Sequence, residues 1–197
     1  MSVPVVVRLV FWIWFAAAVF VGQQRLLQRL PPFAGPLILA ALTALVLLGY
    51  FRLAALRQWF DRLDLRHLVL GHVSRFVGIY FLLLYFRGEL PYSFAVPAGV
   101  GDIVVALAAL LVVFLPLGYE RRHRLISIWN IVGLTDILLV VATAIRLNLV
   151  DPWQLRALTR LPLSLLPTFL VPLIIATHVI IFTRIARARA ANAHTNR

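Results

Sequence analysis

The chain has 197 residues, of which 62% are hydrophobic and 13% are charged, whereas a soluble domain is about half apolar and about a quarter charged. This composition excludes an ordinary water-soluble domain and predicts a membrane protein. The net charge of +12 comes from 19 basic residues, all of them arginine. They lie between and after apolar segments rather than in one basic domain, so we expect no nucleic-acid partner.

Six apolar segments are close to the length of about 20 residues that a helix needs to cross a lipid bilayer. Their ranges are Val5–Gly22, Phe33–Phe51, Leu68–Phe86, Tyr92–Leu117, Ile126–Ile145 and Leu163–Thr183. The first could be a signal peptide, but it has no charge before Arg8 and a poor cleavage site, so we interpret it as a helix. The sequence therefore predicts an all-α bundle of six transmembrane helices, with a single domain over residues 1–186 and a basic cytoplasmic tail over residues 187–197.

The distribution of arginine predicts the orientation of this bundle. The segments after the second and fourth helices and the C-terminal tail carry more arginines than the loops on the other side, so both termini are expected in the cytoplasm. Two connectors are predicted to be short helices in the membrane interface. Residues 52–65 place their apolar side chains on one helical face, and residues 152–160 follow Asp151 as N-cap and start with Pro152.

Polar side chains inside the predicted bilayer are the candidate functional residues, because each ionisable one costs at least about 2.5–3.5 kcal/mol on insertion scales. The last four predicted helices contain His72, Arg75, Asp102, Asn130, Asp136 and His178. At about 1.5 Å per helical residue, the two histidines and Asn130 share one depth near the cytoplasmic edge. Arg75 lies one turn deeper, and the two aspartates lie near the middle of the bilayer or beyond it.

One arginine and two aspartates leave an excess negative charge if all three are ionised, so an aspartate or a histidine is expected to hold a proton. We expect a site that binds, or transports with proton coupling, a small solute or lipid-like molecule. Its residues would be Arg75, Asp102, Asn130, Asp136 and His178. Arg75 would be a counter-ion or anion anchor, the aspartates would carry protons, and His178 would relay them on the cytoplasmic side. A purely structural arginine–aspartate pair is the alternative.

The histidines allow a further interpretation. His72 and His178 lie at equal depth on different helices and could be the axial ligands of a b-type haem. No other cofactor or metal is assigned, because a zinc site would need further ligands. Only the two aspartates could supply them, and they are predicted to lie at other depths.

The stretch FAVPAGVGD interrupts the fourth apolar segment. Pro97 is expected to bend this helix, with Gly99 and Gly101 allowing another helix to approach closely. Its last four residues resemble the GxGD signature of presenilin-like and prepilin-peptidase intramembrane aspartyl proteases. That resemblance implies a hydrolase in which Asp102 and Asp136 pair as general acid and base. The GxGD aspartate is the second of the pair in those families but the first here, and no PAL motif follows.

A longer pattern covers most of the chain after the second helix. It consists of R-x-x-G at residues 75–78, LPYSFAVPAGVGD at 90–102, WNIVGLTD at 129–136 and PTFLVP at 167–172, followed by His178. This pattern is similar to an uncharacterised group of small bacterial multi-pass membrane proteins. The resemblance implies a location in the bacterial inner membrane and the same polar positions, His72 excepted, without implying an activity. The two prolines of PTFLVP are also expected to bend the sixth helix.

Overall fold

Six helices in the described part of the chain are long and apolar enough to cross a membrane, as the sequence predicts. The computed structural model describes residues 5–116 and 118–195, which contain helices and connectors but no β-strand. In chain order the elements are α1 (Val5–Gln23), η1 (Leu26–Arg29), α2 (Ala34–Arg52), α3 (Ala54–Arg62), α4 (Leu65–Gly71), η2 (His72–Phe76), α5 (Val77–Phe86), α6 (Tyr92–Phe114), α7 (Tyr119–Val150), η3 (Pro152–Thr159), η4 (Leu166–Leu170) and α8 (Val171–Thr195). Leu117, the predicted end of the fourth span, lies outside the described residues, as do residues 1–4 and 196–197.

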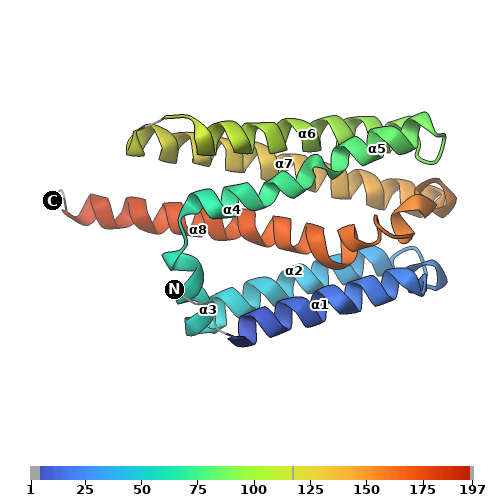
Figure 1. Cartoon of the computed structure of the whole chain (residues 1–197), viewed down its shortest axis with the longest axis horizontal. Helices are drawn as coiled ribbons and strands as arrows, with labels where there is room; N and C mark the ends of the chain where they lie inside the picture. Colours follow the sequence, from blue (N-terminus) through green and yellow to red (C-terminus); the bar gives the residue numbers. More distant parts are fainter. Residues whose placement is uncertain (1–4, 117, 196–197) are drawn as a thin grey trace.

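The axes of the long helices are roughly aligned, and α8 lies in the middle of the bundle (Figure 1). Helices α1 and α2 lie along one side of α8, and α4 to α7 lie along the other. Helix α2 packs against α8 and η4, whereas α6 packs against α5 and α7. The start of α1 and the end of α8 lie at the same end of the bundle, which we call the terminal end. The opposite end, which contains η1 and η3, is the distal end.

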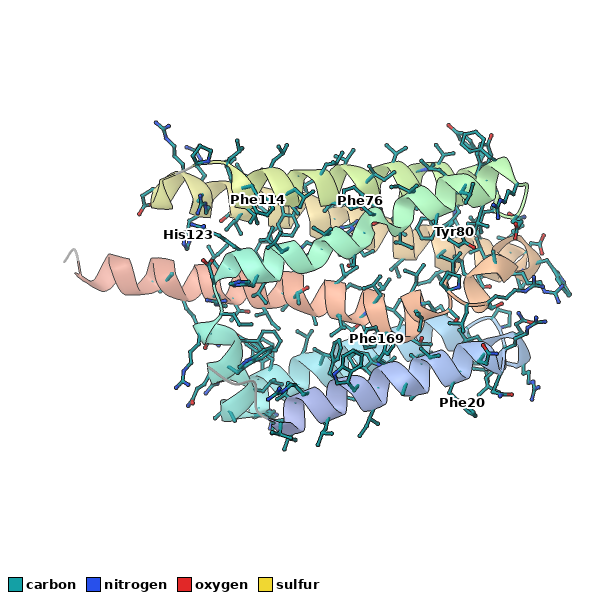
Figure 2. All side chains as sticks on the ribbon, viewed as in Figure 1. Phe20, Phe76, Tyr80, Phe114, His123 and Phe169 are labelled. Carbon is teal, nitrogen blue, oxygen red and sulfur yellow. The ribbon has the colours of Figure 1, made fainter. Side chains whose placement is uncertain are left out.

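Large apolar side chains cover the outside of the bundle, where they project from the outer faces of the helices (Figure 2). Phe20 of α1 is 59% exposed and Phe114 at the end of α6 is 72% exposed. Such side chains are stable on this surface only when lipid, rather than water, surrounds them. The chain is therefore a multi-pass membrane protein.

The third span is not the continuous helix that the sequence predicts. It consists of α4, the 3₁₀ turn η2 and α5. Ser74, in this turn, donates its hydroxyl to the Gly71 carbonyl at 2.8 Å, and such local bonds compete with helical hydrogen bonding. Short 3₁₀ stretches inside a helix often mark functional positions. Here the turn contains Arg75, whose side chain is directed into the bundle.

The last span begins with a π-helical turn, η4, whereas α6 is continuous through Pro97. Pro172 has no N–H, so it leaves the Thr168 carbonyl without its usual helical donor. Trp14 of α1 donates its Nε1–H to this carbonyl at 2.8 Å. The neighbouring Phe169 packs edge-on against aromatic rings of α1. The proline-rich start of the last span thus attaches α1 to the rest of the bundle.

Both predicted interfacial segments contain a short helix. Asp151 caps η3 as predicted, because its Oδ1 accepts the Trp153 N–H at 3.1 Å, although η3 is a 3₁₀ helix rather than an α-helix. At the terminal end α3 stops at Arg62, earlier than the predicted residue 65. Asp64 then starts α4 by accepting the Arg66 N–H at 2.9 Å.

Candidate functional site

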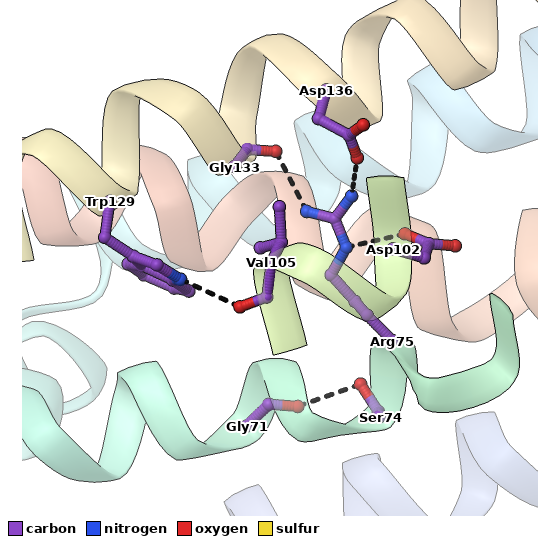
Figure 3. A network of polar contacts seen from close by, with 8 residues as sticks. All are labelled: Gly71, Ser74, Arg75, Asp102, Val105, Trp129, Gly133 and Asp136. Carbon is purple, nitrogen blue, oxygen red and sulfur yellow. Dashed lines mark hydrogen bonds and ion pairs between the residues drawn. The ribbon is translucent and has the colours of Figure 1, made fainter. Parts of the chain in front are cut away.

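Arg75 is the centre of a buried ion-pair cluster (Figure 3). Its side chain is completely buried, and each of its three nitrogens donates to a different acceptor. Nε donates to Asp102 Oδ1 at 2.6 Å, and Nη1 donates to the Gly133 carbonyl at 2.9 Å. Nη2 donates to Asp136 Oδ2. One arginine of the third span therefore joins α6 and α7, and it brings together three of the predicted site residues.

Glycines provide the space for this cluster. A Cβ at Gly101 would overlap Oδ1 of Asp136, so the missing side chain makes room for that carboxylate. A Cβ at Gly78 would lie 2.5 Å from the Gly99 carbonyl oxygen, and one at Gly99 would lie 2.8 Å from the Gly78 carbonyl oxygen. The close helix approach expected at Gly99 is therefore confirmed, and its partner is α5.

The charges of the cluster do not balance. One guanidinium and two carboxylates give a formal charge of −1 when all three groups are ionised. Asp102 is only 3% exposed, and Asp136 is partly buried. Since an uncompensated charge away from water is costly, a proton or a bound cation would complete the cluster.

His72 and His178 form a second polar group, one turn from Arg75 toward the terminal end. Asn130 donates its Nδ2–H to the His178 carbonyl at 3.0 Å, so its Oδ1 accepts the Nδ1 proton of His178 at 2.7 Å. Thr177 donates its hydroxyl to backbone carbonyls of α8, so it accepts from Nε2 of His72 at 3.1 Å. Nδ1 of His72 and Nε2 of His178 are buried and have no hydrogen-bond partner in the described chain. Each can therefore accept a proton.

The histidine pair does not fit a haem. The centroids of the two imidazole rings are 4.2 Å apart, and metal–nitrogen bonds are about 2 Å long. Two ligands on opposite faces of an iron would hold their ring centres farther apart, and a porphyrin has no room between rings in contact. Among the described residues, no group of three or more His, Asp or Glu side chains could hold a metal ion. This geometry therefore does not favour the alternative that assigned His72 and His178 as haem ligands.

The two aspartates do not form a protease pair. In aspartyl proteases two carboxylates lie about 3 Å apart and share one proton. Asp102 and Asp136 instead bind different nitrogens of one guanidinium group, which stands between them. The two carboxylates therefore do not face each other, as they would in the pair that the hydrolase alternative requires.

A cavity of about 460 Å³ reaches the ion-pair cluster. It lies between α2 and α7, extends from η1 and η3 at the distal end into the bundle, and has a mainly apolar lining. The charged groups at its inner end are Arg75 and Asp102. Helices α5 and α6 add the aromatic rings of Phe81 and Phe94 to its lining. The polar residues of its distal part include Gln28, Asn148, Arg156 and Thr159. The other predicted site residues lie outside the lining.

The structure thus divides the predicted site into two groups, the ion-pair cluster and the histidine group with Asn130. Sequence reasoning missed the Gly133 carbonyl, because a backbone acceptor has no signal in the residue type. It also missed Trp129, whose ring centroid lies 4.9 Å from that of His72. The Nε1–H of Trp129 donates to the Val105 carbonyl at 3.0 Å (Figure 3). Gly133 and Trp129 both belong to the stretch WNIVGLTD, and this pattern was the signal that could have indicated them.

Comparison with known proteins places this site inside a family. A profile described as a domain of unknown function, DUF8737, matches residues 32–186. No curated protein and no solved structure shows significant similarity to the chain. The matched region contains all residues of the ion-pair cluster and of the histidine group, and it excludes only α1 among the long helices. Since the match covers most of the sequence, the chain belongs to the DUF8737 family.

Proposed function

We propose that this protein binds a small solute or lipid-like molecule in the cavity and transports it with proton coupling in the bacterial inner membrane. The observation that supports this function best is the cavity of about 460 Å³ that ends at the Arg75–Asp102 pair. Apolar cavities of roughly 300–1,000 Å³ with a few convergent polar groups are typical of small-molecule sites. A purely structural ion pair would need no such access.

The geometry favours one of the two roles proposed for Arg75. All three nitrogens of this side chain already donate, and two of their acceptors are carboxylates. An anionic ligand would have to compete with both aspartates, so Arg75 acts as their counter-ion rather than as an anion anchor. Asp102 is the carboxylate that contacts the ligand, because it lines the cavity and Asp136 does not.

Proton coupling is supported by the histidine group. Each imidazole has one buried nitrogen without a hydrogen-bond partner in the described residues, and His72 lies one helical turn from Arg75. The group lies between the ion-pair cluster and the terminal end, which is the cytoplasmic end in the predicted orientation. Protons that neutralise the cluster could therefore be exchanged with the cytoplasm through His72 and His178.

The binding function can be tested with tritiated 1-adamantanol, a compact neutral probe, in a scintillation-proximity assay on the detergent-solubilised protein. Gly35 lines the cavity, and a Cβ there meets no atom within 4 Å. The Gly35→Phe substitution should therefore fill the cavity without a backbone clash. We expect saturable binding to the wild type and at least about tenfold weaker binding to this variant, which corresponds to about 1.4 kcal/mol.

Gly71→Phe is the matched control. A Cβ at Gly71 also meets no atom within 4 Å, but this residue does not line the cavity. Its affinity for 1-adamantanol should stay close to that of the wild type. Absence of saturable binding, or an equal effect of both substitutions, would overturn the proposed function.

A further inference from the structure

We infer that the ligand of this cavity is an amphipathic cation, with an apolar body and a protonated amine that binds Asp102. This inference rests on the proposed function, because it names the class of molecule that the same cavity takes. On this inference the site binds a positively charged group rather than a phosphate or carboxylate head group.

The first argument is the charge at the inner end of the cavity. Arg75 supplies one positive charge against the two negative charges of Asp102 and Asp136, so one more positive charge would neutralise the cluster. The neighbouring histidine group does not line the cavity. Among the residues that do line it, the second basic side chain is Arg156 of η3, at the distal end. An anionic head group would meet the unbalanced carboxylates, whereas an ammonium group would neutralise them.

The second argument is the hydrogen bonding of Asp102. Its Oδ1 accepts from Arg75, while its Oδ2 has no hydrogen-bond partner among the described residues. A carboxylate oxygen is an acceptor only, so the complementary ligand group is a donor. An ammonium group supplies both the donor and the missing charge, and charge-assisted hydrogen bonds of this kind are stronger than neutral ones.

The third argument concerns the rest of the ligand. Between the inner and distal ends the walls are apolar, and they include Phe81 and Phe94, whose ring centroids are 5.4 Å apart. At the distal end Arg156 lies over the ring of Trp153, 4.8 Å from its centroid. A second cationic group would be repelled by Arg156. The cavity therefore suits a ligand with one amine at the inner end and an apolar body toward the distal end.

Three derivatives of one rigid cage test this inference by competition with tritiated 1-adamantanol. They are 1-adamantylammonium, unlabelled 1-adamantanol and adamantane-1-carboxylate, which differ in charge but little in shape. We expect the ammonium compound to bind about tenfold more tightly than the alcohol, and the carboxylate more weakly than the alcohol. If the alcohol binds but the ammonium compound binds no better, the inference is overturned while the proposed function stands. If tritiated 1-adamantanol itself shows no saturable binding, the proposed function fails.

Variants of Asp102 test whether this residue causes the preference for the ammonium compound over the alcohol. In Asp102→Asn the ratio of the two dissociation constants, alcohol over ammonium, should fall to about one, whereas Asp102→Glu should retain a preference for the ammonium compound. Glu89→Gln removes one negative charge from an exposed residue outside the cavity and should keep the wild-type ratio. The ratio is measured within each variant, so a general loss of affinity does not change it. A wild-type ratio in Asp102→Asn would overturn the assignment of Asp102. If that variant does not fold, loss of the preference in Asp102→Glu would do the same.

Discussion

Asp102 and Asp136 both bind Arg75, but they differ in what else they contact. Asp102 lines the cavity, whereas Asp136 does not, and one oxygen of Asp136 occupies the space that a Cβ at Gly101 would take. The first carboxylate can therefore bind a ligand directly. The second sets the charge of the cluster without contacting the ligand.

This division of roles predicts a proton exchange. If a proton neutralises the empty cluster, a bound ammonium group replaces it, so binding of 1-adamantylammonium should release about one proton per ligand. Since the proton and the ligand compete, affinity should increase as the pH rises. Isothermal titration calorimetry in buffers with different ionisation enthalpies counts the protons released.

Two controls accompany this measurement. 1-Adamantanol adds no charge and should release no proton. Asp136→Asn leaves Arg75 balanced by Asp102 alone, so the release should fall toward zero. Equal proton release from the wild type and from Asp136→Asn would show that the proton does not come from the cluster.

At the scale of helices, the crossing of α5 and α6 holds the site in place. Arg75 lies in η2, which directly precedes α5, and Asp102 lies on α6. The distance between α5 and α6 therefore determines whether the two side chains can pair. The glycines at the crossing let the two backbones touch, as small residues do in other membrane helix pairs. The sequence R-x-x-G therefore couples the charged residue to the glycine that lets it reach its partner.

Gly78→Ala tests this crossing. The added Cβ would lie 2.5 Å from the Gly99 carbonyl oxygen and 2.9 Å from the Asp102 Cβ, and overpacking of this kind costs typically 1–3 kcal/mol. We expect a lower midpoint of thermal unfolding in detergent. Gly71→Ala is the control, because its Cβ meets open space and alanine is favoured over glycine in a helix by roughly 1 kcal/mol. Equal shifts in both variants would contradict the proposed role of the crossing.

At the scale of the molecule, the six spans could be predicted because a bilayer imposes length and apolarity on each helix separately. The ion-pair residues could be predicted because ionisable groups are rare inside a membrane. The break at η2 could not, since it depends on a serine bond and on the pairing of Arg75 with other helices. The cavity could not either, because its walls combine residues 27–39 with residues 137–174, and no local period connects these segments.

The orientation of the bundle is the remaining prediction for the whole molecule, and the absence of cysteine makes it directly testable. Gln58 of α3 and Glu89 between α5 and α6 are both exposed, at the terminal and distal ends respectively. If both termini are cytoplasmic, a membrane-impermeant maleimide should label Glu89→Cys in intact bacterial spheroplasts. It should label Gln58→Cys only after permeabilisation. The unsubstituted chain has no thiol and provides the background. The reverse labelling pattern would mean that the cavity opens toward the cytoplasm and that the histidine group faces the outside.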